Sequence, residues 1–419
     1  MSVPPGDFMS GQTNVIEREQ DAARMSRPVY LDHAATTPVD PRVAAAMAQC
    51  LTAEGEFGNP ASASHSFGDA AAALVETARA QVAAAVGAAP SEVVWTSGAT
   101  EADNLAIFGV AHYYREHGRH IVTARTEHKA VLDPCRELER RGWRVTYLAP
   151  DSGGVVHPEQ VAAALQADTV LVSIMQVNNE IGVIQDVPAI AAACAKHGAA
   201  RLHVDAAQSV GKIAVDFAGL GVDLMSLSAH KVYGPKGVGA LLVSRRGGPG
   251  GSRERVQLTA LQFGGGQERA LRAGTVATHQ VVGMGLAFEL ARTAPPSEVE
   301  RIAALRERLW RGLASIGGIC RNGDAKRSVP HVLNVSFEGV EGESLVAAVR
   351  GRLAVSTGSA CTSALQEPSY VLRALGRDDI SSESSLRFGL GRGTRESDID
   401  TAVAVVAGAV LRLRKIGGA

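Results

Sequence analysis

Short apolar runs rich in Val, Ile and Leu alternate along residues 92–244 with Ala-rich segments of helical periodicity. Such runs predict buried strands, and apolar residues spaced three or four apart predict amphipathic helices. We expect seven strands, at residues 92–96, 120–124, 143–149, 169–175, 201–207, 224–229 and 239–244, and helices that include residues 61–86 and 186–198. Strands alternating with helices predict an α/β fold with a mostly parallel seven-stranded sheet, covered on both faces.

The pattern changes from residue 286. A long helical segment at residues 297–316 precedes strand-like runs at 331–337 and 353–357, and a closing helix is expected at 396–416. This order predicts a smaller α+β domain, with a boundary near the segment TAPPSE at residues 293–298. We expect the large domain to span residues 41–285, the small domain to combine residues 28–40 and 286–419, and residues 1–27 to form a disordered tail.

Composition agrees with an ordinary globular protein of two domains. The chain has 419 residues, 46% of them hydrophobic and 20% charged. The formal net charge is −1, with 42 basic against 43 acidic residues, so no global field attracts nucleic acid or an anionic membrane. No apolar run reaches the roughly 18–20 residues that span a bilayer. The N-terminus lacks the apolar core of a signal peptide, so we expect a cytoplasmic protein.

The five cysteines are Cys50, Cys135, Cys194, Cys320 and Cys361. Their wide spacing and odd number argue against a structural zinc site or a disulfide framework. The first four lie in or beside apolar or helical patterns, and we expect them to be buried thiols. Cys361 differs, because the segment STGSACTS at 356–363 surrounds it with side chains no larger than threonine. These residues and the permissive Gly358 predict a mobile thiol.

Chemically capable side chains follow several of the expected strands. In parallel sheets, ligands bind beyond the carboxyl ends of the strands. Lys231 follows one strand and precedes a Gly/Pro-rich turn. A lysine there can simply be solvated, but a partly desolvated amine also forms Schiff bases with aldehydes. Asp205 ends another strand, either as a helix cap or as the carboxylate that keeps the pyridine nitrogen of pyridoxal 5'-phosphate (PLP) protonated. Gln208 then lies within reach of the ring oxygen of PLP.

Three further strand ends add to this set. Ser97 to Thr100 join a strand to a helix, where N–H groups either cap the helix or bind a phosphate. His128 follows the next strand as a structural histidine, or as an imidazole that stacks on a flat ring and moves protons. Asn178 and Asn179 end a fifth strand, where an amide can contact ring or substrate.

Long motifs throughout the chain resemble the cysteine desulfurases, which are fold-type I, class V PLP enzymes, and especially the branch that assembles iron–sulfur clusters. The matching segments run from about residue 30 to residue 392 and include YLDHAATTPVDPRV, TSGATEADNLAI, TEHKAVLD, VNNEIGVIQD, HVDAAQSVGK, SAHKVYGPKGVGALLV, GGGQERALRAGT, STGSACTS and SSLRFGLGR. They cover nearly the whole chain and many are specific to this family.

The resemblance implies a role for each matching residue. Lys231 holds PLP as a Schiff base, Asp205 meets the pyridinium nitrogen, and His128 stacks on the ring and shuttles protons. Arg387 takes the substrate carboxylate in the two-pronged geometry of a guanidinium. The other implied cofactor contacts are Asn179 and Gln208 at the ring oxygen, and Ala99, Thr100, Ser228, His230 and the facing subunit's Thr275 at the phosphate. Asn179 is also implied in substrate binding, and the shared Thr275 contact implies a homodimer.

The implied reaction converts L-cysteine to L-alanine and leaves its sulfur as a persulfide on Cys361. Either His128 or the substrate removes the proton of the Cys361 thiol, which is mostly protonated at neutral pH. Implied acceptors are an iron–sulfur scaffold protein and carriers for tRNA thiolation, and a transient [2Fe–2S] cluster shared with the scaffold through Cys361 stays open. No intrinsic metal site is expected. The chain ends at RLRKIGGA, without the further tail that helps such enzymes dock the scaffold.

Other readings of the same fold stay open. A selenocysteine lyase or cysteine sulfinate desulfinase does not need a long mobile cysteine segment, so STGSACTS favours the desulfurase. A dimeric assembly platform without turnover is disfavoured by the presence of both Lys231 and Cys361. A transaminase or kynureninase-like enzyme would show itself by turnover of an amino acceptor.

Overall fold

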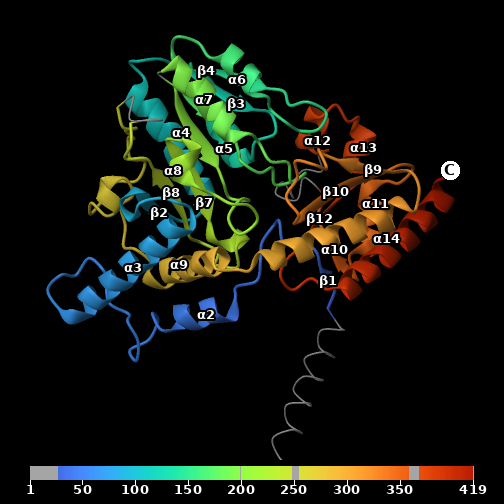
Figure 1. Cartoon of the computed structure of the whole chain (residues 1–419), viewed down its shortest axis with the longest axis horizontal. Helices are drawn as coiled ribbons and strands as arrows, with labels where there is room; N and C mark the ends of the chain where they lie inside the picture. The colour runs from blue at the N-terminus through green and yellow to red at the C-terminus, as the bar shows by residue number, and fades with distance from the viewer. Residues whose placement is uncertain (1–26, 199, 248–253, 358–367, 419) are drawn as a thin grey trace, which may run out of the picture.

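The computed structural model describes residues 27–198, 200–247, 254–357 and 368–418. They form a larger α/β unit and a smaller α+β unit side by side (Figure 1). The expected N-terminal tail, apart from residue 27, lies outside the described residues, and so does Cys361.

The seven expected strands of the larger unit are confirmed. They are β2 (Val93–Thr96), β3 (His120–Ala124), β4 (Arg144–Leu148), β5 (Thr169–Ser173), β6 (Arg201–Asp205), β7 (Leu224–Ser228) and β8 (Gly239–Val243). They form one sheet in the order β2-β8-β7-β6-β5-β3-β4. The pairs from β7 through β6, β5 and β3 to β4 are parallel, and β8 is antiparallel to both of its neighbours. The prediction of a mostly parallel sheet is therefore correct.

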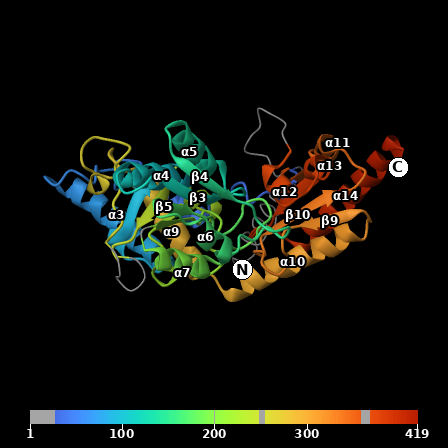
Figure 2. The same cartoon turned by 90° about the horizontal axis from the view of Figure 1, so that it is seen from above.

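Helices cover both faces of this sheet, as Figure 2 shows. The larger unit contains α2 (Pro41–Ala48), α3 (Ser66–Ala85), α4 (Ala99–Tyr114), α5 (Lys129–Arg140), α6 (Pro158–Ala164), α7 (Val187–His197), α8 (Phe217–Leu220) and α9 (Thr278–Arg292). Side chains of β2 alternate between two cores: Val93 and Trp95 belong to the core that also includes residues of α3, α7 and α9, and Val94 belongs to the core that includes residues of α4 and α5. This alternation is the period of two that a strand imposes.

The smaller unit has its own core. Its antiparallel sheet runs in the order β12-β10-β9, built from β12 (Ser385–Gly389), β10 (Val332–Phe337) and β9 (Ile319–Asn322). The N-terminal strand β1 (Val29–Tyr30) pairs in parallel with β11 (Leu353–Ala354), which joins the two ends of the chain in one unit. The helices are α10 (Pro296–Ala314), α11 (Gly342–Val349), α12 (Tyr370–Ala374), α13 (Asp379–Glu383) and α14 (Glu396–Gly417).

The change of core falls between α9 and α10. Val281, Met284, Ala287 and Phe288 of α9 all belong to the core of the large sheet. A boundary between residues 285 and 286 would therefore cut through the buried face of one helix. We therefore propose the domain boundary at residues 293–295, within the segment TAPPSE expected from the sequence, with residues 28–40 kept in the small domain.

The cysteines follow the sequence prediction with one exception. Cys50, Cys135 and Cys194 are buried free thiols, as expected, whereas Cys320 is exposed. Cys320 lies on β9, the edge strand of the small sheet, where its thiol accepts a hydrogen bond from Arg377 Nη2 at 3.1 Å. Successive side chains of β9 point to opposite faces of the sheet, and Cys320 is exposed between the half-buried Ile319 and Arg321.

Candidate active site

The polar strand ends of the large sheet converge on one cavity of about 540 Å³. Ten of the residues expected from the sequence line it: Ala99, Thr100, His128, Asn179, Asp205, Gln208, Ser228, His230, Lys231 and Arg387. All but Arg387 come from the large unit, whereas Arg387 lies on β12 of the small one. The cavity therefore lies between the two units, beyond the carboxyl ends of the parallel strands.

Lys231 ends the short helix η2 (Ala229–Lys231), directly after β7. Its Nζ donates hydrogen bonds to the carbonyl oxygens of Ala34 and Ala35, each at 2.7 Å. Residues 34 and 35 follow β1 in the chain, so the N-terminal segment holds the amine inside the cavity.

Asp205 ends β6 and is 5% exposed. Its Oδ1 accepts a hydrogen bond from the backbone N–H of Ala207 at 2.9 Å. Burial raises the pKa of Asp205, and the nearby carboxylate of Asp103 raises it further. A cationic ring nitrogen beside Asp205 would lower that pKa again, because an opposite charge favours the ionised form.

Asp103 belongs to the same cavity, and sequence reasoning missed it. It is 1% exposed, and neither carboxylate oxygen has a hydrogen-bond partner among the described residues. His203 Nε2 lies 3.5 Å from its Oδ1. The available signal was a charged residue on the buried face of α4, between Ala102 and Leu105.

The start of α4 is shaped for an anion. Gly98 precedes the helix with φ of 155°, and a Cβ added there would meet no atom within 4 Å. The first N–H groups of a helix have no partners within the helix and attract negative charge. Glu101 in this first turn would repel an anion, but Arg272 Nε lies 2.9 Å from its Oε1 and offsets that charge.

His230 also lines the cavity, and its imidazole ring is neutral. Burial lowers the pKa of His230 to about 4, and the charges of Lys231 and Lys236 contribute. Its Nδ1 lies 3.1 Å from Thr36 Oγ1. A neutral imidazole can donate one N–H to an anion without adding a buried charge.

His128 caps helix α5, and this sets its tautomer. Its Nδ1 accepts a hydrogen bond from the backbone N–H of Ala130 at 3.1 Å. A ring nitrogen that accepts from an N–H carries no proton itself, so the neutral ring holds its proton on Nε2. His128 therefore has one defined nitrogen from which a proton can move within the cavity.

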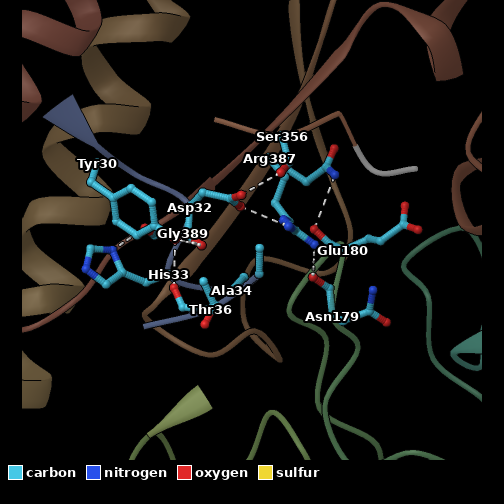
Figure 3. Close-up of polar contacts among 12 residues, drawn as sticks. Tyr30, Asp32, His33, Ala34, Thr36, Asn179, Glu180, Ser356, Arg387 and Gly389 are labelled. Atoms are coloured by element: carbon cyan, nitrogen blue, oxygen red, sulfur yellow. Dashed lines mark hydrogen bonds and ion pairs between the residues drawn. The ribbon is translucent and has the colours of Figure 1, made fainter. Parts of the chain in front are cut away.

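Arg387 lies between Asp32 and Asn179, as Figure 3 shows. Its Nη2 donates to Asp32 Oδ1 and its Nη1 donates to the backbone oxygen of Asn179, both at 2.9 Å. Its Nε is buried without a hydrogen-bond partner among the described residues, as is Oδ1 of the Asn179 side chain. The unsatisfied Nε and the remaining guanidinium N–H groups suit a carboxylated ligand, whereas the Asn179 oxygen can accept a hydrogen bond from a donor on a ligand.

Two expected residues are not placed in this cavity. Thr275 is exposed and does not line the cavity of its own chain. Cys361 lies in the segment 358–367, outside the described residues. Described residues on either side of this segment contact two carboxyl side chains that neighbour Arg387. Ser356 Oγ donates to Asp32 Oδ2 at 2.8 Å, and Ser369 Oγ donates to Glu180 Oε2 at 2.5 Å.

Comparison with known proteins identifies the family. The model of the family described as "Aminotransferase class-V" matches residues 29–402. The chain belongs to this family. Within it, the chain is 55% identical over 392 residues to "Cysteine desulfurase IscS" of Pectobacterium atrosepticum, covering 94% of this chain and 95% of the relative. A relative of the same name from Aeromonas hydrophila is 57% identical over the same length, with the same coverage.

Solved structures agree with this placement. A structure described as "NIFS-LIKE PROTEIN" has a TM-score of 0.84 and 35% identity, covering 92% of this chain and 100% of that chain. Another, "SspA in complex with cysteine", has a TM-score of 0.75 and 35% identity, covering 86% of this chain and 98% of that chain. The predicted class V family and the fold of its PLP enzymes are thereby confirmed.

The cavity fits PLP, the cofactor of class-V aminotransferases and cysteine desulfurases. It combines an amine on Lys231, a buried carboxylate on Asp205 and the open turn at Gly98 before α4. These groups match the aldehyde, the ring nitrogen and the phosphate of PLP, respectively. The unsatisfied Asn179 Oδ1 and Arg387 Nε also leave polar groups for a ligand to satisfy.

Two further properties of the described part of the chain concern membrane insertion and metal binding. No helix there combines the length and apolarity needed to cross a bilayer. No group of three or more His, Cys, Asp or Glu side chains within those same ranges is arranged to hold a metal ion.

Proposed function

We propose that this protein is a PLP-dependent cysteine desulfurase that converts L-cysteine to L-alanine and collects the sulfur as a persulfide on Cys361. The observation that carries the proposal is the meeting of Lys231, Asp205, His128 and Arg387 in one cavity, although they come from separate parts of the chain. The 55% identity to relatives named cysteine desulfurase supports the same conclusion.

The residues that would hold PLP follow from the cavity. Lys231 would bond its aldehyde carbon, Asp205 would pair with its ring nitrogen, and Gln208 and Asn179 would contact its ring oxygen. The start of α4 at Ala99 and Thr100, with Ser228 and His230, would hold its phosphate. When bound, PLP supplies an electron sink that makes the sulfur of L-cysteine open to attack by a thiolate.

The chain's own residues bind the substrate and move protons. Arg387 receives the carboxylate of L-cysteine with the N–H groups that Asp32 and Asn179 leave unused. His128 gives and takes a proton at Nε2, because Ala130 occupies its Nδ1. The Cys361 thiolate bonds to the substrate sulfur as the carbon–sulfur bond breaks, so the sulfur moves to Cys361 and the carbon skeleton leaves as L-alanine.

We further propose a homodimer in which Thr275 of each chain reaches the phosphate site of the other. The exposure of Thr275 on its own chain supports this arrangement. The proposed recipients of the persulfide sulfur are an iron–sulfur scaffold protein and other carrier proteins in the cytoplasm, with tRNA thiolation among the uses. A [2Fe–2S] cluster shared with the scaffold through Cys361 belongs to the same proposal.

Two measurements test the function. Borohydride reduction of the purified holoenzyme should attach PLP to Lys231, detected by peptide mass spectrometry. Cys361→Ala should abolish the release of sulfide and L-alanine from L-cysteine while the visible absorbance of the cofactor stays. Cys320→Ala is the matched control, because Cys320 is an exposed thiol that does not line the cavity. Full activity of Cys361→Ala, or an unlabelled Lys231, would overturn the proposal.

A further inference from the structure

A second buried lysine lies behind the cavity and has no part in the mechanism above. Lys212 belongs to the turn that follows β6 and is only 8% exposed. It lines a separate cavity of about 20 Å³, together with His33, His331 and Lys231. That volume is enough for about one water molecule. Lys231 lines this cavity and the active site alike, so the nearly buried Lys212 lies close behind the site.

Lys212 contacts one side chain of the site directly. Its Nζ donates a hydrogen bond to Gln208 Oε1, four residues earlier in the same turn. Among the described residues, Lys212 forms no ion pair. The charged or titratable groups that interact electrostatically with it are Lys231, Arg387, His33, His230 and His331. Glu298 and Arg392 line the same small cavity, but neither forms an ion pair with Lys212 among the described residues. The amide of Gln208 is therefore the one recorded side-chain acceptor for this amine.

This contact determines which end of the Gln208 amide enters the active site. Burial and the neighbouring charges of Lys231 and Arg387 lower the pKa of Lys212 to about 7, but its Nζ is the donor in this contact and the Gln208 oxygen is the acceptor. The charged form of the amine has three donors and no acceptor, so it selects the oxygen of the amide. The other end, Nε2, donates to the backbone oxygen of Ala34 at 2.8 Å. An amide nitrogen carries two hydrogens, and the second remains available to a ligand in the cavity that Gln208 lines.

The position of that N–H is also defined. The same Ala34 oxygen accepts a hydrogen bond from Lys231 Nζ at 2.7 Å. Because two donors share one acceptor, the Gln208 amide lies directly beside the Lys231 amine. The ring oxygen of PLP neighbours the carbon that bonds this amine, so the N–H of Gln208 lies where an anionic oxygen needs a donor.

We propose that Lys212 is a positioning residue that holds the Gln208 amide with its N–H, and not its C=O, toward the ring oxygen of PLP. The inference rests on the proposed function, because it concerns the same cofactor site. Packing alone does not account for a lysine here. Replacing a buried charge by an apolar residue of similar size is often neutral or stabilising, so methionine would fill the space equally well.

Binding of PLP to the apoenzyme provides the test. Without Lys212, the Gln208 amide can rotate so that its oxygen, and not its N–H, faces the ring oxygen of PLP. The anionic ring oxygen then loses the hydrogen bond that Gln208 donated to it. We expect Lys212→Met to weaken PLP binding about tenfold and to raise the pH midpoint of the cofactor's visible absorbance by about one unit. The midpoint rises because an anionic ring oxygen that has lost a donor holds a nearby proton more tightly. Lys196→Met, at an exposed lysine of α7, is the control and should match wild type.

A double-mutant cycle separates positioning from a direct effect of the lysine charge. If Lys212 acts through Gln208, then Lys212→Met should change PLP affinity less than about twofold in a Gln208→Leu background. Additive effects of the two substitutions, or wild-type affinity and midpoint in Lys212→Met, would overturn the proposal.

Two further measurements keep the outcomes distinct. If borohydride fails to attach PLP to Lys231 of the wild type, the proposed function fails; if it labels Lys231 and Lys212→Met still behaves as wild type, only the role of Lys212 fails. Should Lys212→Met not fold, a neutron crystal structure of the wild-type holoenzyme decides. Gln208 Oε1 facing Lys212 supports the inference, and Nε2 facing Lys212 refutes it.

Discussion

Arg387 Nη2 lies 2.9 Å from Asp32 Oδ1, so the proposed substrate-binding arginine already has a carboxylate partner. The two side chains are 4% and 18% exposed, and Figure 3 shows Ser356 on the other oxygen of Asp32. A guanidinium this buried needs a counter-charge when no substrate is present. When L-cysteine binds, its carboxylate joins a pair that is already neutral, and Asp32 repels it.

Asp32→Asn should therefore tighten substrate binding. The amide keeps an oxygen for Arg387 Nη2 but removes the negative charge. We expect the KM for L-cysteine to fall about threefold to tenfold, as for the loss of one like charge several ångströms away at moderate effective dielectric, with a smaller change in kcat. Steady-state kinetics would measure this. Ser356→Ala, which removes the other contact of Asp32 and leaves its charge, should stay within about twofold of wild type. A KM that is unchanged or raised in Asp32→Asn contradicts the argument.

His128 combines a capping role with a proposed proton-transfer role, and two substitutions separate them. Asparagine is also a good N-cap, so His128→Asn should retain the stability of α5 but lose about 10²–10⁴-fold in kcat. His128→Ala should lose the same catalysis and, in addition, about 1 kcal/mol of stability. Urea denaturation and single-turnover kinetics on both variants provide the comparison, and near-normal kcat in His128→Asn would remove the histidine from the proton path.

Glu180 should make the protein less stable as the pH rises toward neutrality. Burial raises the pKa of Glu180 from 4.5 to about 7, although Ser369 and Arg387 oppose the shift. Between these two values the unfolded chain ionises the carboxyl while the folded chain keeps it protonated, so the free energy of unfolding falls with rising pH. The full effect is on the order of 3 kcal/mol.

Glu180→Gln isolates this effect, because glutamine resembles the protonated carboxyl and does not titrate. The variant should gain stability relative to wild type as the pH goes from about 4.5 to 7, and the gap should then stay constant. Urea denaturation at several pH values measures the difference. A gap that does not change with pH would mean that Glu180 is ionised in the folded protein.

The buried pair of Arg79 and Glu268 supports an unusual backbone turn. Both Nη atoms of Arg79 donate to the Glu268 carboxylate at 2.9 Å, and the backbone N–H of Trp95 adds a third bond. Glu268, Arg269 and Ala270 all have positive φ values, of 47°, 58° and 63°. Non-glycine residues adopt this conformation at a cost, so the turn depends on these contacts.

Arg79→Met should be strongly destabilising because it leaves the Glu268 carboxylate buried without its partner. We expect a loss of about 3–5 kcal/mol in the free energy of unfolding. Arg42→Met is the matched control, since Arg42 pairs with Asp40 at the surface with a side chain 65% exposed, and it should cost less than about 1 kcal/mol. Equal losses in the two variants would show that the buried pair has no special role.

The location of the site was predictable from local pattern to a large extent. All seven strands of the large sheet lie where the apolar runs place them, and Lys231, Asp205 and His128 follow their strands as expected. Parallel strands bring their carboxyl ends to the same edge of the sheet, so residues that follow these strands lie close together in the fold. The expectation that failed is the burial of Cys320, because the exposure of a strand residue depends on what packs against its face of the sheet.

Periodicity and turn residues thus determined the strands, the helices and the edge of the sheet that carries the chemistry, because each depends on residues a few positions apart. Only the tertiary structure decided that Asp32 meets Arg387, that the buried Asp103 lies near Asp205 and His203, and that Lys212 contacts the Gln208 amide. These contacts depend on how the two units pack and on which way a turn points its side chains. Residues as far apart as 32 and 387 carry no local signal of such a meeting.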